Sequence, residues 1–518
     1  MSASSTRRDM LAISPAAGVS SLVPPHFARA ADDNTIHPLK INVPGPRRVP
    51  TAPLSVVCAR RFAARMEISD MNEKADNPLT TPRAQVSRRE GLKLGATSIM
   101  ASLLTASAPA ATQTQSPPQK EDTVTDKAAI RPFQVSFPDA EVVDLRRRVN
   151  ATKWPERETV TDASQGVQLA TIQKLARYWG TEYDWSKCEA RLKSLPHFIT
   201  EIDGLDIHFI HVRSKHDNAL PMIVTHGWPG SIIEQLKIIG PLTDPTAHGA
   251  SASDAFHLVI PSLPGYGFSG KPTMAGWGPE RIARASIALM KRLGYTKFVA
   301  QGGDWGALIT QLMGAQAPPE LLAIHTNMPG AVPPDIDKAA FVGAPAPAGL
   351  AADERHAYDQ LVFFYTHGLA YAQEMGSHPQ TLYGIADSPI GLAGWIIDHD
   401  RDSYEMIARV FDGKPEGLTR DDVLDNITFY WLTNTGISSA RLYWENKLAF
   451  FAPQNIRIPV AVSVYPTEIY AAPRSWVEKA FPKLIHFNKL PKGGHFAAWE
   501  QPQFFCAEMR AAFKSLRT

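Results

Sequence analysis

The pentapeptide Gly302–Gly306 (Gly-Gly-Asp-Trp-Gly) constrains the fold more than any other part of this sequence. It follows the apolar run Phe298–Gly302 and precedes the helical stretch Ala307–Ala317. Glycines two residues before and two residues after a central side chain permit a strained turn where a strand and a helix nearly touch. The pentapeptide therefore predicts a strand–turn–helix unit that presents Asp304 at the end of a buried strand.

Several other short apolar runs end in glycine-rich or polar turns, as the buried strands of a parallel sheet do. These runs are Pro221–Thr225, Phe256–Leu263, Ala323–Thr326, Pro459–Tyr465 and Leu484–Phe487, after an earlier alternating run, Leu205–Val212, that is typical of an antiparallel strand. Helices are expected at Arg474–Ala480 and Gln501–Leu516. We predict an α/β class chain with the α/β-hydrolase fold: a mostly parallel central sheet flanked by helices, a helical lid insertion and an N-terminal meander.

The 518 residues are enough for a large core with accessory segments. The stretch from Ile130 to about His197 has a helical, tryptophan-rich pattern, and Pro333–Phe451 is helical and rich in aromatic residues. We predict a duplicated leader without a fold at 1–65, a signal and linker at 66–128, the meander at 129–215, the first part of the core at 216–330, the lid at 331–455 and the second part of the core at 456–518.

The leader contains two segments of the twin-arginine export type. The clearer one has Arg88-Arg89, then an apolar stretch and the small residues Ala106-Ser107-Ala108; Arg7-Arg8 begins a similar, earlier copy. We interpret the first copy as a relic, with Met66 or Met71 as the working start. A mature chain beginning near Ala111 is expected in the periplasm or outside the cell, or in the cytoplasm if the leader does not function.

Composition excludes several function classes. A net charge of +2 does not favour nucleic acid or an anionic membrane as partner, and no apolar run is long enough to span a bilayer in the mature form. The three cysteines, Cys58, Cys188 and Cys506, are far apart, and no metal-binding spacing of histidines occurs. We expect no metal and no cofactor.

Three residues predict nucleophilic chemistry. Asp304 stands where other elbows carry serine, and a carboxylate nucleophile attacks an sp³ carbon to give an ester that water must then hydrolyse. The alternative is that Asp304 only caps the helix after it. His495, in a Gly-Gly-His turn before the last helix, is the expected base, and Glu468 follows the preceding strand as its orienting acid. The chain order of nucleophile, acid and histidine is the order of this fold.

Backbone N–H groups are expected to stabilise the developing oxyanion. One should come from Trp305, next to the nucleophile, and one from the turn formed by His226, Gly227 and Trp228. A tight turn without a binding role is the alternative, and Pro229 is expected to follow a cis peptide bond there.

The motifs H-G-W-P-G, G-G-D-W-G and G-G-H-F-A-A-W-E together resemble those of epoxide hydrolases of the microsomal type. The resemblance covers about Ile130 to Leu516, including the N-terminal domain of that family. It implies conversion of an epoxide and water to a vicinal diol through an ester on Asp304. It also implies that Tyr371 and Tyr443, in the lid, donate hydrogen bonds to the epoxide oxygen. The microsomal enzymes carry a membrane anchor, whereas this chain carries export-like segments.

Two other functions remain open from the sequence. A haloalkane dehalogenase shares the aspartate nucleophile and a neighbouring tryptophan, but it binds halide through N–H donors and needs no acid. A catalytically silent ligand-binding protein would not need the set of nucleophile, acid and histidine. The absence of any G-x-S-x-G pattern disfavours an esterase.

Overall fold

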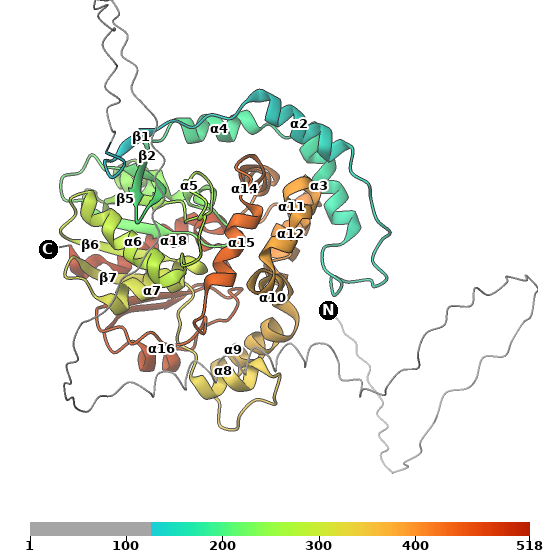
Figure 1. The fold of residues 1–518 in the computed structure, drawn as a ribbon. Helices are drawn as coiled ribbons and strands as arrows, with labels where there is room; N and C mark the ends of the chain where they lie inside the picture. The colour runs from blue at the N-terminus through green and yellow to red at the C-terminus, as the bar shows by residue number, and fades with distance from the viewer. Residues whose placement is uncertain (1–125, 518) are drawn as a thin grey trace, which may run out of the picture. The chain divides into compact units, whose positions relative to one another are not determined.

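The structure is a computed structural model and describes residues 126–517. Within this range nine strands form one sheet, in the order β1-β2-β3-β5-β4-β6-β7-β8-β9. Figure 1 shows the fold as a ribbon. Their bounds are β1 Arg131–Phe133, β2 His197–Ile202, β3 Leu205–Val212, β4 Leu220–Thr225, β5 Phe256–Pro261, β6 Phe298–Gly302, β7 Leu321–Thr326, β8 Val460–Val464 and β9 Leu484–Lys489.

The six strands from β5 to β9 along this order are parallel, and β1, β2 and β3 join them as an antiparallel extension. Every residue of β5, β6 and β8 is buried, as expected for strands covered on both faces by helices. The mostly parallel, helix-flanked sheet predicted from the sequence is thus confirmed.

The helices fall into three groups by their place in the chain. The N-terminal group is α2 Asp139–Asn150, α3 Leu169–Thr181 and α4 Trp185–Lys193. The core group is α5 Leu236–Thr243, α6 Pro279–Arg292, α7 Trp305–Gln316, α16 Arg474–Ala480, α17 Ala497–Glu500 and α18 Pro502–Ala512. The lid group, between β7 and β8, is α8 Pro334–Phe341, α9 Ala352–Phe363, α10 Ala370–Ser377, α11 Tyr383–Asp387, α12 Pro389–Ile397, α13 Arg401–Phe411, α14 Arg420–Leu432 and α15 Gly436–Glu445.

The N-terminal stretch is less helical than the sequence pattern predicts. It contributes β1 and β2 to the sheet, and β2 and β3 form a hairpin whose turn, Asp203-Gly204, has positive φ at both residues. An Asp-Gly pair between alternating apolar residues is the usual sequence signal for such a hairpin. The helices predicted up to about His197 are α2, α3 and α4, but the strand β1 inside that stretch and the strand β2 that begins at its end were not predicted from the sequence.

Helices α2, α3 and α4 pack against the lid helices (Figure 1). The indole Nε1 of Trp179 donates to Thr428 Oγ1 at 3.0 Å, and the hydroxyl of Tyr183 donates to Asp425 at 2.7 Å. Both acceptors lie on α14, so the N-terminal segment holds the lid as well as extending the sheet.

The predicted leader segments fall on residues 1–125, outside the described part of the chain. None of the helices between residues 126 and 517 combines the length and the apolar character needed to cross a membrane.

The chain reverses its direction of travel across the sheet between β4 and β6. From β4 it moves to β5 on one side, and it then returns to place β6 on the other side. Thr225 and Gly302, the last residues of β4 and β6, are register partners, so the turns that follow these strands lie next to each other. A crevice at this position is where open α/β sheets bind ligands.

The turn from β6 into α7 leaves no room for side chains at its glycines. A Cβ at Gly306 would lie 2.0 Å from the carbonyl oxygen of Thr225, and one at Gly302 would lie 1.9 Å from the carbonyl oxygen of Gly306. Because the obstructing atoms belong to the backbone, they cannot move without shifting the sheet or the helix.

We predict that Gly306→Ala lowers the free energy of unfolding by about 3 kcal/mol, the upper part of the range for overpacked sites. Gly394→Ala is the matched control, because a Cβ at Gly394, inside α12, meets nothing within 4 Å. The control should be neutral or stabilising by up to about 1 kcal/mol, the helix propensity difference. Denaturant unfolding of the two variants checks this, and equal stability would contradict the close approach at the turn.

Candidate active site

Asp304 lies at the turn after β6 with φ 50° and ψ −129°, and its residue is 6% exposed. A positive φ is unfavourable for a residue with a Cβ and is kept where the surroundings enforce it. Although Asp304 precedes α7, its side chain makes no capping hydrogen bond to the helix. The carboxylate is therefore not used as a helix cap and faces the crevice.

The carboxylate of Asp304 is held by backbone N–H groups. Oδ1 accepts a hydrogen bond from the N–H of Trp228 at 2.6 Å, and the N–H of Trp305 also interacts favourably with the carboxylate. Gly227 permits this approach, because a Cβ there would lie 2.1 Å from Oδ1. The Trp228–Pro229 peptide bond is cis, as expected from the sequence. The two donors are those that the sequence predicts for an oxyanion hole.

The other oxygen faces His495. The Nε2 atom of His495 lies 3.3 Å from Asp304 Oδ2, and its Nδ1 atom lies 2.5 Å from Glu468 Oε1. The loop that carries His495 is held by Glu500, which accepts hydrogen bonds from the N–H groups of Gly494 and Phe496. Asp304, His495 and Glu468 thus come together from three separate strand ends.

Asn327 is a contributor that the sequence analysis missed. It follows β7, and its Nδ2 donates to Glu468 Oε2 at 3.0 Å, while the N–H of Ile469 donates to Oε1 at 2.9 Å. These two donors leave Glu468 oriented toward His495. An asparagine directly after a predicted strand was the available signal, but asparagine is common in such turns.

Burial and charge act in opposite directions on the central pair. Burial favours the neutral forms of both groups, but each stabilises the ionised form of the other. The interaction with His495 lowers the pKa of Asp304, and the carboxylates of Glu468 and Asp304 raise the pKa of His495 well above its usual value. Asp304 is therefore ionised at neutral pH, as a nucleophile must be.

Tyr371 and Tyr443 lie above the residues whose N–H groups face Asp304. The ring of Tyr371 stacks on Trp228 with centroids 5.0 Å apart, and Tyr443 meets Trp305 edge to face at 4.7 Å. Their own rings are 5.9 Å apart. Burial and the charge of Asp304 raise the pKa of both phenols well above the usual value, so both remain protonated hydrogen-bond donors.

The side chain of His226 contacts neighbouring turns and not Asp304, although His226 belongs to the turn predicted for the oxyanion hole. Its Nε2 accepts from the N–H of Leu263 at 3.3 Å, and its Nδ1 lies 3.0 Å from the carbonyl oxygen of Gly227. Burial lowers the pKa of His226 to about 4, so it is neutral. Its imidazole connects the turns after β4 and β5, and the binding group of this motif is the N–H of Trp228.

Two further buried groups near Asp304 were not identified from the sequence. Burial and the charge of Asp304 raise the pKa of Glu234 to about 8. His399, between α12 and α13, has Nε2 at 3.9 Å from Asp304 Oδ2 and Nδ1 at 2.9 Å from Asp400 Oδ2. The three-residue run Asp398-His399-Asp400 was visible in the sequence, but no strand end marks it.

Asp304, His399 and His495 form the group in residues 126–517 with the spacing to hold a metal ion. An ion there would occupy Oδ2, the oxygen left free by the N–H donors, and would prevent its attack on carbon. The arrangement therefore fits carboxylate chemistry better than a resident metal.

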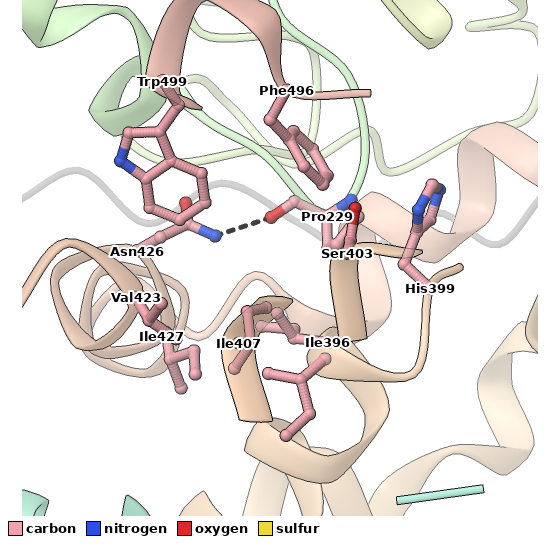
Figure 2. A pocket seen from close by; sticks show the side chains of 11 residues that line it. Pro229, Ile396, His399, Ser403, Ile407, Val423, Asn426, Ile427, Phe496 and Trp499 are labelled. Carbon is pink, nitrogen blue, oxygen red and sulfur yellow. Dashed lines mark hydrogen bonds between the residues drawn. The ribbon is translucent and has the colours of Figure 1, made fainter. Parts of the chain in front are cut away.

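A small cavity of about 20 Å³ lies beside His399. Figure 2 shows its lining of apolar side chains from α12, α13 and α14, closed on another side by Phe496 and Trp499. His399, Ser403 and Asn426 are its polar residues, and this space is enough for about one water molecule.

Two family models match the chain. The model described as "Epoxide hydrolase N terminus" matches residues 130–235, and the model described as "alpha/beta hydrolase fold" matches residues 221–382. Together they cover the N-terminal helices, the elbow and part of the lid.

Relatives match over nearly the whole described part. A protein of Stigmatella aurantiaca (strain DW4/3-1) named "Putative epoxide hydrolase" is 50% identical over 75% of this chain and 86% of its own length. Epoxide hydrolase 1 of Oryctolagus cuniculus is 34% identical, with 74% of this chain and 88% of that protein covered. The crystal structure of juvenile hormone epoxide hydrolase from the silkworm Bombyx mori superposes with a TM-score of 0.66 at 28% identity, over 75% of this chain and 95% of that one.

Proposed function

The chain belongs to the epoxide hydrolase family, and on this premise we propose that it opens its epoxide through a covalent ester on Asp304. It is a hydrolase that acts on the ether bond of epoxides and has the α/β-hydrolase fold. The observation that carries the mechanism is the carboxylate of Asp304, whose Oδ2 faces His495 at 3.3 Å, while the two lid tyrosines pack on Trp228 and Trp305 next to it.

In the first step, Asp304 Oδ2 attacks a ring carbon of the epoxide, and the carbon–oxygen bond to the ring oxygen breaks. The N–H of Trp228 holds the other oxygen, Oδ1, and so leaves Oδ2 available for the attack. Tyr371 and Tyr443 stabilise the departing oxygen by hydrogen bonds and supply its proton. The product of this step is an ester of Asp304 in which the former epoxide oxygen is a hydroxyl group on the neighbouring carbon.

In the second step, His495 removes a proton from water, and the water oxygen attacks Cγ of Asp304. Ester formation removes the charge of Asp304, which is one cause of the raised pKa of His495, so the imidazole passes its proton to the tyrosinate left by the first step and becomes free to accept one from water. The oxyanion that forms at Oδ1 lies against the N–H of Trp228, with the N–H of Trp305 as the expected second donor. Breaking of the Cγ–Oδ2 bond, with the remaining proton of the attacking water moving to Oδ2, releases the vicinal diol and restores the carboxylate.

The alternatives left open by the sequence are less consistent with this site. A haloalkane dehalogenase releases an anion that requires no acid, whereas two protonated phenols pack on the tryptophans beside Asp304. A silent binding protein has no need of an ionised, buried aspartate beside an oriented histidine, because burying these charges costs stability.

We also propose export by the twin-arginine route. The Arg88-Arg89 segment and its small-residue exit support this. Cys188 and Cys506 are buried free thiols, so the part of the chain from 126 to 517 has no disulfide that would have to form after export.

We predict that His495→Gln accumulates the ester. The variant retains Asp304 and the tyrosines, so ring opening proceeds, but no base activates water for the second step. Peptide mass spectrometry after mixing with styrene oxide should find the mass of the substrate added to Asp304. An inactive variant without this adduct, under conditions where wild type forms diol, would contradict the covalent route.

We predict that Tyr443→Phe and Tyr371→Phe each slow ester formation about 10- to 100-fold, the lower part of the range for acid catalysis. Hydrolysis of a preformed ester should change little, because the tyrosines act on the epoxide oxygen. Rapid-quench kinetics of both half-reactions measures this, with Tyr383→Phe as control, since Tyr383 is 65% exposed on the lid. A selective effect on ester hydrolysis would assign the tyrosines another role.

A further inference from the structure

His399 repeats, on the lid side, the arrangement of His495. Each imidazole has Nδ1 hydrogen-bonded to a carboxylate, Asp400 for His399 and Glu468 for His495. Each Nε2 faces the same oxygen of Asp304, at 3.9 Å and 3.3 Å respectively. The two rings lie 4.7 Å apart and are inclined by 35°. Asp304 therefore lies opposite two oriented histidines, of which the mechanism above uses one.

The tautomer of His399 follows from its neighbours. An ionised carboxylate only accepts hydrogen bonds, so a neutral His399 carries its proton on Nδ1 and exposes a lone pair on Nε2. Asp400 is fixed by the N–H of Ser403, which donates to Oδ1 at 2.8 Å. Burial opposes the ionisation of Asp400, but the hydrogen bond from His399 outweighs it and lowers the pKa of Asp400 to about 2.

The Nε2 atom of His399 is buried and has no hydrogen-bond partner among residues 126–517. The side chain of His399 is 1% exposed. An unpaired acceptor in such a buried place costs free energy unless a ligand satisfies it. The acceptor points into the catalytic crevice, where one of the substrates is water.

We propose that His399, positioned by Asp400, is the second hydrogen-bond acceptor of the water that hydrolyses the ester on Asp304. This inference rests on the covalent mechanism proposed above. One nitrogen of each histidine and an oxygen of Asp304 lie within 4.8 Å of one another. A water that donates both O–H groups, about 105° apart, over hydrogen bonds of about 2.8 to 3.0 Å bridges acceptors about 4.4 to 4.7 Å apart, so a single molecule reaches both imidazoles.

Two acceptors orient this water more completely than one. Water has two O–H donors, and binding both leaves its lone pairs free, one of them directed at Cγ of Asp304. As the oxygen bonds to Cγ, the proton moves to His495 Nε2, and the remaining O–H stays bonded to His399. The small cavity on the lid side of His399 has room for a water molecule that replaces the one consumed (Figure 2).

A structural role for His399 has to be separated from this one, because its ring also packs against Tyr371 at 5.0 Å and Trp228 at 5.9 Å. His399→Phe retains an aromatic ring and removes the acceptor. His399→Gln places an amide oxygen near the position of Nε2 and retains an acceptor. Disrupted packing would disturb the tyrosine and hence ester formation, whereas a lost water contact disturbs ester hydrolysis alone.

The test is a pair of half-reaction rates, measured by rapid quench with styrene oxide and mass spectrometry of the Asp304 peptide. We expect His399→Phe to slow ester hydrolysis about 10- to 100-fold, within the range for a lost catalytic hydrogen bond, and to change ester formation less than threefold. His399→Gln should recover most of the hydrolysis rate. His356→Phe, at an exposed position of α9, should change neither rate.

Unchanged hydrolysis in His399→Phe, or equal losses in both half-reactions, would overturn the proposal. A change in the hydrolysis rate of wild type after dialysis against a chelator would also overturn it, because a cation would then occupy the three atoms. Failure of the underlying mechanism is distinguishable: it would appear as the absence of any ester in His495→Gln, whereas failure of this inference leaves that ester in place.

Discussion

The carboxylate of Asp304 is buried at the end of a parallel strand, and its contacts determine much of what surrounds it. A buried charge is tolerated when hydrogen-bond donors and an opposite charge replace the water it has lost. Here the N–H of Trp228 holds Oδ1, and His495 faces Oδ2. The glycines of the elbow and Gly227 are required because the backbone must come this close. A single packing constraint thus produces the strained turn, the oxyanion donors and the nucleophile.

The lid supplies the acid side of the chemistry, and its position depends on contacts made far away in the sequence. Helices α3 and α4 pack against α12, α13 and α14, and the bond from Trp179 to Thr428 is buried in this contact. The lid in turn places Tyr371 and Tyr443 on the two tryptophans that hold Asp304. The N-terminal segment therefore affects catalysis through the position of the tyrosines.

Asp304, Glu468 and His495 were predictable from the sequence because each follows a strand in a turn marked by glycine or proline, and strand ends of a parallel sheet meet at one edge. Asn327 also follows a strand, but asparagine carries little information there. His399 lies between two lid helices, so only the three-dimensional packing brings it to Asp304. Strands β1 and β2 were missed for a related reason: β1 has three residues, and both pair at the antiparallel end of the sheet, where burial is incomplete and the pattern is weak.

The central claim is that Asp304 Oδ2 forms a bond to substrate carbon, and a single turnover in water enriched in heavy oxygen tests it most directly. With enzyme in excess over styrene oxide, water attacks Cγ of Asp304, so the account predicts that the label enters the Asp304 carboxylate and that the first diol carries none. One oxygen of this diol is the former epoxide oxygen, and the other comes from Asp304 itself. Label in the first diol, with none in the Asp304 peptide, would mean that water attacks the epoxide directly and would contradict the account.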